Sequence, residues 1–466
     1  MMRSAEKWCE EEMNASGEDK RTLVVGLGVT GLSVARFLAS RGDETLVIDS
    51  RARPPGLEAL RRDQPQISIV LESLDVRWLE GVSRVVLSPG LGLDIPIVVE
   101  AQRLGIPIIN DIELFAQAVD TPVIGVTGSN GKSTVVTLLE RILSATGVRV
   151  ASGGNLGPPA LELLEVPAEA YLLELSSFQL ETAENFRSIA CAVLNVSPDH
   201  LDRHGSFERY VSLKAKLAQS ADTFVFNWDD EAVREMARKH GQTIAYSVHE
   251  PLEAGYSAAE HRGERWLCRD GAPLMKVAEL ALQGLHNEAN VLAAMALAGV
   301  VTGEFLGPRR EAELDELRAF PGLPHRCQRV AEEDGVVFIN DSKGTNVGAT
   351  VAALRGLSGP FVLIAGGRAK DADFAPLVAA AEGRLVGAVV IGEAAAELQA
   401  ALSPTASVQA AQDMREAVGS ALEIARAATA RPITVLLSPA CASLDMYPNY
   451  RKRGDVFVEA VKEHLG

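Results

Sequence analysis

The chain has few cysteines and no long apolar run. Its five cysteines are far apart in 466 residues and form no Cys-x-x-Cys pair. The sequence therefore indicates neither a disulfide scaffold nor a zinc site. The longest apolar stretch, near residues 291–301, is well short of the about 18 residues that a membrane-spanning helix needs. We expect a protein that does not enter a membrane and works in a reducing cytoplasm.

Basic residues are also fewer than acidic residues. The chain has 45 Lys and Arg against 62 Asp and Glu, a formal charge of -17, whereas a general nucleic-acid binder needs a basic face. Any anionic ligand must therefore be held by local Lys, Arg and backbone N–H groups. At about 150 residues a domain, the length predicts about three domains. Residues 1–20 are polar and acidic and lack the apolar core of a signal peptide, so we expect a disordered leader.

The motif around which the chain is organised is TPVIGVTGSNGKST at residues 121–134. A Gly-rich turn between a strand and a helix presents N–H groups to phosphate, a Lys to the outer phosphates and a hydroxyl to Mg2+. The usual loop has a glycine five residues before Gly131, where this chain has Val126, so the motif is a shortened variant. An ordinary strand-to-helix turn is the alternative. The predicted ATP-binding set is Gly128, Ser129, Asn130, Gly131, Lys132, Ser133 and Thr134.

A second Gly-rich turn, GLGVTG at residues 26–31, separates a predicted strand at 21–25 from a helix. Asp49 follows near the distance at which dinucleotide-binding folds carry a ribose-binding acid. Alone, this pattern favours NAD or FAD, but the same geometry holds any diphosphate at a helix N-terminus. A further loop of small residues, SPGLG at 88–92, follows the predicted strand 84–87. The first domain is predicted to end near Asn110.

The middle of the chain carries two groups of polar residues at predicted strand ends. The strand 170–175 delivers Glu174, which suits Mg2+ beside a phosphate loop but could instead cap the next helix. The strand 190–196 leads into SPDHLDRHG at 197–205, with two acids and two histidines. The helix 207–218 then carries Lys214 and Lys216, and solvent exposure is the default for helical lysines.

Residues 222–270 are predicted to be a strand-rich extension. After them, an Ala-rich helix opens with Asn287 and Asn290, which are three apart and so share a face. Their amides could contact a base edge or cap the helix, and the sequence leaves both possibilities open.

The last part of the chain follows a proline-rich joint, FPGLP at 320–324. Three predicted strands, at 336–340, 361–365 and 435–437, run into DSKGTN, GGRAK and SPACAS. Because parallel strands end at one edge of a sheet, these polar groups are expected to line one crevice. A helix at 455–465 closes the chain. The predicted domains are a leader at 1–20 and folded parts at 21–110, 111–322 and 323–466.

With these motifs in order, residues 21–466 resemble the Mur ligases of bacterial cell-wall synthesis. The resemblance is carried by GLGVTGLS, SPGLG, GVTGSNGKST, GGNLG, ELSSFQLE, LNVSPDHLDRHG, GLHNEAN, GLPHR, NDSKGTNVGAT, GGRAK and LSPACAS. ELSSFQLE and SPACAS favour the members that add D-glutamate. The resemblance implies an α/β fold of three domains: a Rossmann-like N-terminal domain, a central P-loop ATPase-like domain with a mostly parallel sheet, and a Rossmann-like C-terminal domain.

The resemblance also implies an activity. It is an ATP-dependent ligation of D-glutamate to UDP-N-acetylmuramoyl-L-alanine through an acyl phosphate, in peptidoglycan synthesis. The N-terminal domain would then hold UDP and no nicotinamide. The alternatives are a ligase of the same family with another amino acid, a relative of folylpolyglutamate synthase, and, more remotely, a nicotinamide-dependent dehydrogenase. We expect a monomer that binds neither nucleic acid nor membrane.

The residues implied by the resemblance fall into four sets. The muramyl nucleotide would contact Val29, Thr30, Ser50, Arg51, Ser88, Gly90, Asn155, Ser176, Gln179 and His200. One Mg2+ would bind Ser133 and Glu174, and a second Mg2+ would bind His200 and a carbamylated Lys214. The catalytic residues would be Lys132, His200 and Lys214. Asn287, Asn290, Arg326 and Asp341 would complete the ATP site. Lys343, Thr345, Lys370, Ser443, Leu444 and Tyr450 would hold D-glutamate, although MYPNY at 446–450 departs from the family by its tyrosines and proline.

Overall fold

The computed structural model describes residues 21–282, 284–303, 310–357, 359–369 and 372–465. They form two compact units. The first comprises the described part of Met1–Asp120 with Gly153–Val166 and Phe178–Phe186, and the second comprises Thr121–Ser152, Pro167–Ser177 and Arg187–Gly466. In the described ranges, no helix is both long and apolar enough to cross a membrane. The predicted leader, 1–20, lies outside the described residues.

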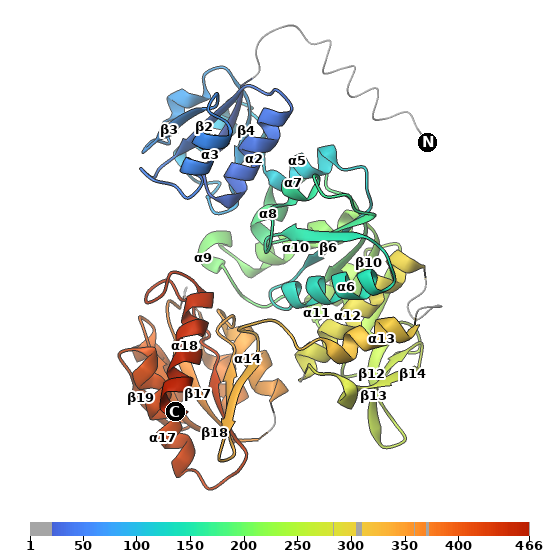
Figure 1. The fold of residues 1–466 in the computed structure, drawn as a ribbon, viewed down its shortest axis with the longest axis vertical. Coiled ribbons are helices and arrows are strands. Elements are labelled where there is room, and N and C mark those ends of the chain that lie inside the picture. Colours follow the sequence, from blue (N-terminus) through green and yellow to red (C-terminus); the bar gives the residue numbers. More distant parts are fainter. Residues whose placement is uncertain (1–20, 283, 304–309, 358, 370–371, 466) are drawn as a thin grey trace. The chain divides into compact units, whose positions relative to one another are not determined.

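The first unit is built on a parallel five-stranded sheet in the order β3-β2-β1-β4-β5 (blue in Figure 1). Leu23, Val25 and Ile48 belong to its core. The order puts the carboxyl ends of β2, β1 and β4 side by side. The strands are β1 (Arg21–Val25), β2 (Thr45–Asp49), β3 (Ser68–Leu71), β4 (Val82–Leu87) and β5 (Ile108–Ile109), and the helical elements of the unit's first segment are α2 (Val29–Ser40), α3 (Leu57–Asp63), η1 (Val76–Leu79), α4 (Pro96–Arg103) and α5 (Asp111–Ala118).

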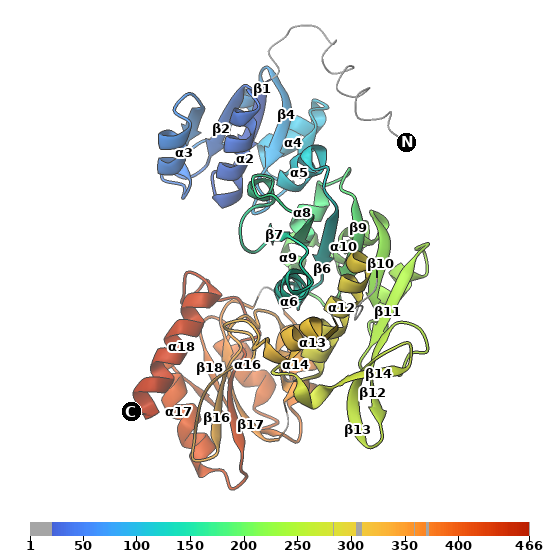
Figure 2. The same cartoon turned by 45° about the vertical axis from the view of Figure 1, so that its right-hand side comes forward.

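A nine-stranded sheet runs in the order β14-β13-β12-β11-β10-β9-β6-β8-β7. Helices α6 and α12 pack together against it and fill its core with residues such as Leu139, Val291 and Met295 (Figure 2). The predicted strand-rich extension is confirmed and continues this sheet through antiparallel strands at its edge. The strands are β6 (Val123–Thr127), β7 (Val150–Gly154), β8 (Ala170–Glu174), β9 (Ser188–Val193), β10 (Ala221–Asn227), β11 (Thr243–Ser247), β12 (Tyr256–His261), β13 (Glu264–Arg269) and β14 (Ala272–Lys276).

Helices in this middle stretch of the chain connect the strands. They are α6 (Lys132–Ala145), α7 (Ala160–Leu163), α8 (Ser177–Glu181), α9 (Leu201–His204), α10 (Phe207–Gln219), α11 (Glu231–Ala237), η2 (Val277–Glu279), α12 (Leu285–Thr302) and α13 (Arg310–Ala319). Helix α10 begins where Ser206 accepts a hydrogen bond from the Arg209 N–H, an N-cap that stabilises a helix by about 1 kcal/mol.

The last sheet has the order β15-β16-β20-β17-β18-β19, parallel except for β15. Along β17, Leu363 faces one apolar cluster while Val362 and Ile364 face the other. Both faces are therefore covered, by α14 to α16 on one side and α17 and α18 on the other (Figures 1 and 2). The strands are β15 (Gln328–Glu333), β16 (Val336–Asn340), β17 (Phe361–Gly366), β18 (Leu385–Ile391), β19 (Ser407–Ala410) and β20 (Ile433–Leu437), and the helices α14 (Val347–Gly356), α15 (Ala375–Ala381), α16 (Ala395–Leu402), α17 (Met414–Ala427) and α18 (Tyr450–Leu465).

The predicted α/β class is confirmed, with three sheets in which parallel pairing dominates. The predicted closing helix, 455–465, was too short at its start. Helix α18 begins five residues earlier, at Tyr450, and its first turns bury Arg453 and Gly454. A buried arginine and a glycine are both unusual on a helix face, which is why the apolar pattern does not reveal this part of the helix.

Candidate active site

The phosphate loop follows β6 and requires glycine at two positions. Gly128 and Gly131 have φ of 154° and 86°, values that other residues rarely adopt. A Cβ at Gly128 would lie 3.1 Å from Cβ of Leu194, and one at Gly131 would lie 2.3 Å from Oδ1 of Asn290. The loop is thus closely packed by neighbouring elements, and its end, Gly131, is the residue that precedes α6.

Two lysines converge on this loop. Lys132 Nζ donates to the carbonyl oxygens of Gly128 at 2.8 Å and Ser129 at 3.1 Å. Lys214, from α10, donates from Nζ to the same Gly128 oxygen at 2.9 Å. Lys214 is only 1% exposed, and its Nζ lies 4.5 Å from the centre of the Tyr210 ring. A protein of strongly negative overall charge therefore concentrates positive charge at the loop predicted to bind phosphate.

Burial lowers the pKa of both lysines. Desolvation, reinforced by the neighbouring Lys132, lowers the pKa of Lys214 well below its ordinary value, although Asp199 and Glu174 oppose this. Desolvation also lowers the pKa of Lys132, against the opposing effect of Glu174. A buried cation loses hydration and gains repulsion from its neighbour, so the neutral amine of Lys214 becomes accessible.

The predicted pair for one Mg2+ is in contact. Ser133 donates from Oγ to Oε2 of Glu174 at 2.5 Å, and both residues are buried. Arg326 donates from Nη2 to the same Ser133 oxygen at 2.7 Å. Glu174 thus faces the phosphate loop, as predicted from its place at the end of β8. Among the described residues, no group of three or more His, Cys, Asp or Glu could hold a metal by itself.

His200 lies in a strained turn. Its φ of 54° is left-handed, which costs a non-glycine residue about 1 kcal/mol or more. Its Nε2 is 3.5 Å from Oδ2 of Asp199, and that oxygen accepts a hydrogen bond from Asn346 Nδ2 at 2.9 Å. The other histidine of the motif, His204, is buried and within 3.0 Å of Ser177 Oγ. The two histidines therefore have different environments.

The asparagines at the start of α12 lie against the phosphate loop. Asn290 donates from Nδ2 to Oδ1 of Asn287 at 3.3 Å, and both side chains are buried. The cap position of α12 belongs to Gly284, so neither asparagine is its N-cap. Asn290 also limits the space beside Gly131, as noted above. This placement favours the prediction of a nucleotide contact for this pair.

Of the predicted D-glutamate residues that the structure describes, four follow the neighbouring strands β16 and β20, and Tyr450 is the first residue of α18. Lys343 Nζ lies 4.4 Å from the centre of the Tyr450 ring. Burial, with repulsion from Arg326 and Lys132, lowers the pKa of Lys343 to about 8. Ser443 is buried, whereas Leu444 is 62% exposed. Thr345 is two residues along the chain from Lys343, and Lys370 lies outside the described residues.

Asp341 is held within the last sheet. Its Oδ2 accepts a hydrogen bond from Ser438 Oγ at 2.7 Å and its Oδ1 one from the Cys327 N–H at 3.2 Å. Burial raises the pKa of Asp341 to about 6. Its predicted role at the ATP site stays a prediction.

In the first unit, the predicted muramyl-nucleotide residues cluster where β1, β2 and β4 end. Ser88 Oγ donates to the Gly26 carbonyl at 3.1 Å, which joins two of the loops. Val29 is 65% exposed, the Arg51 side chain is 51% exposed, and Ser50 and Gly90 are also exposed. Thr30 is partly exposed beside Val29. These residues present an accessible edge of the sheet.

Asp49 is fully engaged inside this unit. Its Oδ2 accepts from the Leu27 N–H and Arg51 Nη2, both at 2.7 Å. Its Oδ1 accepts from the N–H and Nε of Arg51, both at 2.8 Å. A carboxylate has about four acceptor sites, so Asp49 has no capacity left for a ribose diol. This arrangement does not favour the dinucleotide alternative.

The remaining muramyl residues lie on separate segments. Gln179 is buried and its Nε2 is 3.4 Å from Oδ2 of Asp111, while Asn110 Nδ2 donates to the Gln179 carbonyl at 2.5 Å. Asn155 is exposed, and Ser176 is partly buried in the second unit.

Sequence reasoning missed two polar side chains at these sites. Asn195 bonds to the backbone of Asn130 in the phosphate loop. Arg453, 1% exposed, donates to carbonyl oxygens of Ser342, Gly366 and Cys441, which lie at or just after the ends of three strands, β16, β17 and β20. Asn195 lies near the end of the predicted strand 190–196 and could have been found by the strand-end rule, whereas helical arginines are exposed by default.

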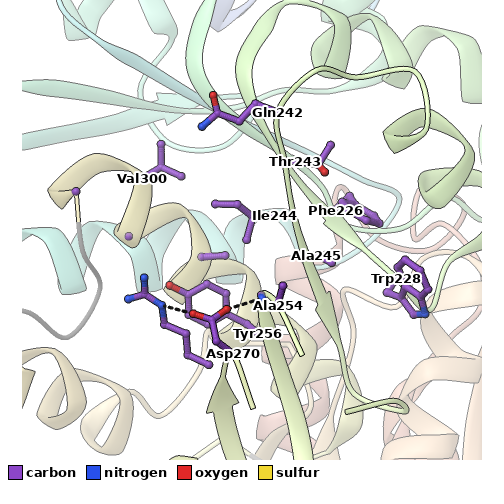
Figure 3. A pocket seen from close by; sticks show the side chains of 15 residues that line it. Phe226, Trp228, Gln242, Thr243, Ile244, Ala245, Ala254, Tyr256, Asp270 and Val300 are labelled. Atoms are coloured by element: carbon purple, nitrogen blue, oxygen red, sulfur yellow. Dashed lines mark hydrogen bonds and ion pairs between the residues drawn. The ribbon is translucent and has the colours of Figure 1, made fainter. Parts of the chain in front are cut away.

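Figure 3 shows a hollow elsewhere, of about 630 Å³, between β10 to β12 and the last turns of α12. Phe226, Trp228 and Tyr256 line it together with aliphatic residues and the Arg269–Asp270 ion pair. None of its fifteen lining residues belongs to the phosphate loop. We therefore assign the candidate site to the phosphate loop and not to this hollow.

Comparisons with known proteins agree along the chain. Residues 20–110 match the Mur ligase MurD-like N-terminal domain, residues 126–298 the Mur ligase middle domain and residues 325–441 the Mur ligase glutamate ligase domain. The UDP-N-acetylmuramoylalanine–D-glutamate ligase of Nitrosococcus oceani is 46% identical over 447 residues, which cover 95% of this chain and 97% of that protein. The enzyme of the same name from Methylococcus capsulatus is 43% identical over 442 residues, covering 95% and 94%.

Solved structures share the fold at low identity. The MurF ligase of Thermotoga maritima, in complex with ADP, has a TM-score of 0.59 at 15% identity and covers 90% of this chain and 95% of its own. The UDP-N-acetylmuramate-alanine ligase MurC of the same organism has a TM-score of 0.58 at 18% identity, covering 96% and 99%. The matched domains in their order, and relatives more than 40% identical over nearly the whole length, show that the chain belongs to the Mur ligase family.

Proposed function

We propose that the protein is an ATP-dependent ligase that joins D-glutamate to the alanyl carboxylate of UDP-N-acetylmuramoyl-L-alanine in peptidoglycan synthesis. The observation that carries the proposal is the convergence of Lys132, Lys214 and the Ser133–Glu174 pair on one Gly-rich loop. Such a loop suits the phosphates of ATP. The choice of D-glutamate is supported by relatives that bear that name and are 46% and 43% identical.

The chemistry follows from the weakness of a carboxylate as an acyl donor. A carboxylate oxygen of the alanyl group forms a bond to the γ-phosphorus of ATP, and the bond to ADP breaks, which gives an acyl phosphate. The amine of D-glutamate then attacks the acyl carbon, loses a proton, and releases inorganic phosphate. Phosphoryl transfer of this kind depends on positioning and charge neutralisation, which Lys132 and the loop N–H groups supply.

The residues at the loop fit Mg2+. This ion usually binds one or two side-chain oxygens and completes its shell with phosphates and water. Ser133 and Glu174 bring two oxygens within 2.5 Å of each other, and Mg2+ bound there would neutralise charge on the phosphates. His200 and Lys214, as a carbamate, are proposed for a second Mg2+.

A carbamate at Lys214 has a physical basis in its surroundings. Carbon dioxide reacts with a neutral amine and not with an ammonium ion, and the burial of Lys214 lowers its pKa. The product is an anion, which would relieve repulsion from Lys132 and supply oxygen ligands for a metal. Burial favours the neutral amine that reacts with carbon dioxide, and the buried carbamate that results is stable only when a cation such as Lys132 or a metal pairs with it.

The last sheet is proposed to hold D-glutamate through Lys343, Thr345, Lys370, Ser443, Leu444 and Tyr450. D-Glutamate has two carboxylates, and a buried lysine pairs well with one of them. Arg326 and Asp341 are proposed to complete the ATP site, with Asn287 and Asn290 on adenine. Gly128, Ser129, Asn130, Gly131 and Thr134 would surround the phosphates.

The first unit is proposed to bind the uridine diphosphate end. Its accessible residues Val29, Thr30 and Arg51 follow β1 and β2, and the exposed cationic face of Arg51 suits a diphosphate or uracil oxygen. Ser50, Ser88 and Gly90 would add contacts, with Asn155, Ser176, Gln179 and His200 on the muramyl-alanyl part. We also propose three domains bounded at 21–110, 111–322 and 323–466, and a monomer that acts in the cytoplasm.

A phosphate-release assay with a substrate panel tests the proposal. The protein is incubated with ATP, Mg2+, UDP-N-acetylmuramoyl-L-alanine and one D- or L-amino acid at a time. We expect phosphate release and a coupled product with D-glutamate alone. Turnover with a different amino acid would overturn the choice of substrate, and no turnover with any would overturn the ligase proposal for this muramyl substrate.

A further inference from the structure

The shortened phosphate loop is held by a side chain from the neighbouring strand. Strands β6 and β9 pair in parallel as far as Thr127 and Val193. Beyond them, the Leu194 N–H donates to the Thr127 carbonyl at 3.0 Å and the Ser129 N–H to the Asn195 carbonyl at 2.9 Å. The backbone pairing therefore reaches the first part of the loop and stops there.

Asn195 continues this pairing with its amide. Its Oδ1 accepts a hydrogen bond from the Asn130 N–H at 2.9 Å, and its Nδ2 donates to the Asn130 carbonyl at 3.1 Å. The side chain thus satisfies both backbone groups of one loop residue, as a paired strand would. Asn130 stands between Gly128 and Gly131, the two residues of the loop with unusual backbone angles.

A second set of bonds ties the same two segments together. Ser129 donates from Oγ to the Ser197 carbonyl at 3.0 Å, and the Ser197 N–H donates to that Oγ at 3.0 Å. Three residues after Ser197 comes His200, which the proposed function places at the second Mg2+ and the muramyl substrate, and Oδ2 of its neighbour Asp199 lies 3.5 Å from its Nε2. These bonds therefore tie the phosphate loop to the segment that carries His200.

We propose that Asn195 is a positioning residue that fixes the phosphate loop at Asn130 and couples it to the segment carrying His200. In its role in turnover this rests on the proposed function, whereas its role in holding the nucleotide does not. Without Asn195, Asn130 would lose two bonds, and the loop N–H groups would have to be ordered by the nucleotide at the expense of affinity.

The test compares two asparagines that lie beside Leu194. Asn195→Ala removes both bonds to Asn130. Asn227→Ala is the control, because Asn227 Nδ2 donates to the Leu194 carbonyl at 2.9 Å and is not bonded to the loop. We measure the Kd of Mg-ADP by calorimetry, the KM of ATP, kcat and the melting temperature. We expect the Kd and KM of Asn195→Ala to rise about tenfold, the equivalent of one to two hydrogen bonds, and those of Asn227→Ala to stay within about twofold.

The coupling between the nucleotide site and the muramyl-substrate site gives a second measurement, which would not change if Asn195 had a purely structural role. The affinity for UDP-N-acetylmuramoyl-L-alanine is measured with and without a non-hydrolysable ATP analogue, and the ratio of the two is expected to approach one in Asn195→Ala. If that variant does not fold, Asn195→Asp, which keeps the shape and the acceptor oxygen, replaces it. Wild-type Kd, KM and coupling ratio in a folded Asn195 variant would overturn the inference. Failure of the wild type to turn over would instead count against the proposed function, with Mg-ADP binding still testing Asn195.

Discussion

Lys214 Nζ and the Gly128 carbonyl oxygen lie 2.9 Å apart, which places the one lysine of α10 that is almost wholly buried directly on the phosphate loop. Lys216, two residues further along α10, is partly exposed. The two lysines therefore form a matched pair, in which one is inside the candidate site and the other is outside it.

We predict that Lys214→Ala lowers kcat by about a hundredfold or more, the scale of losing a charge-positioning group in an active site. Lys216→Ala should keep nearly all activity. In wild-type protein supplied with carbon-labelled bicarbonate, a carbamate signal should appear in the NMR spectrum and be absent from Lys214→Ala. Undiminished turnover in Lys214→Ala would remove this residue from the site.

Glu174→Gln should raise the Mg2+ concentration needed for half-maximal velocity by about tenfold or more, since a neutral amide is a weaker ligand for a hard cation. A second Ser–Glu pair, which lies outside the phosphate loop, provides the control. In this pair, Ser152 Oγ donates a hydrogen bond of 2.8 Å to Glu140 Oε2. Glu140→Gln should leave the Mg2+ requirement unchanged. The measurement is initial velocity over a Mg2+ titration at fixed ATP, and equal curves for the two variants would contradict the assignment.

The pKa of Lys343, lowered to about 8, predicts a pH-dependent affinity for dicarboxylates. Below pH 8 the amine is charged and binds an anion, and above it the free enzyme loses this charge. Glutarate, which resembles glutamate but has no amine, should therefore inhibit competitively with a Ki that rises up to about tenfold per pH unit above 8. In Lys343→Arg the guanidinium stays charged, so the Ki should not rise in that range. A flat profile in the wild type would show that Lys343 does not hold the anion.

Neutralising Asp111 and neutralising Glu113, two acids on α5, should shift the melting temperature at pH 7.5 in opposite directions. Burial raises the pKa of Asp111 to about 6, so the folded state keeps a proton that the unfolded state releases near pH 4. Stability therefore falls as pH rises from about 4 to 6, by up to about 3 kcal/mol for two pKa units. Asp111→Asn, which stays neutral, should raise the melting temperature at pH 7.5 and lose this advantage near pH 4.

Glu113 provides the contrast, because its carboxylate accepts hydrogen bonds from the Glu184 N–H and from the N–H and Nδ2 of Asn185. Glu113→Gln should lower the melting temperature at pH 7.5, since an amide cannot accept at both ends. The measurement is the calorimetric melting temperature of both variants at pH 7.5 and near pH 4. A loss of stability in both at pH 7.5 would mean that burial of charge at Asp111 is not a net cost.

Much of the fold could be predicted from short, strongly patterned segments. The strand 336–340 was placed to the residue, because a β-branched, apolar run bounded by polar residues has few other solutions. The place of Glu174 beside the phosphate loop followed from the rule that parallel strands end at one edge, whereas its pairing with Ser133 was implied by the family resemblance. The predicted ligand contacts of these and the other site residues stay predictions.

The parts that could not be predicted depend on long-range packing. Arg453 lies on a helix, where an arginine is usually solvated, and only the meeting of three loops explains its burial. The position of Asn195 near a strand end could be predicted, but its pairing with Asn130 could not, because the two residues are 65 apart in sequence. Polar pairs at such separation leave no periodic signal.

The place of β20 in the last sheet has a consequence for synthesis of the chain. β20 is the last strand to leave the ribosome, yet it lies between β16 and β17, which begin about 97 and about 72 residues earlier in the chain.

 

Until Leu437 has emerged, those two strands lack their shared neighbour, and a row of backbone N–H and C=O groups on each stays unpaired. A nascent or truncated protein that stops before residue 433 would therefore offer two unpaired strand edges to chaperones and proteases.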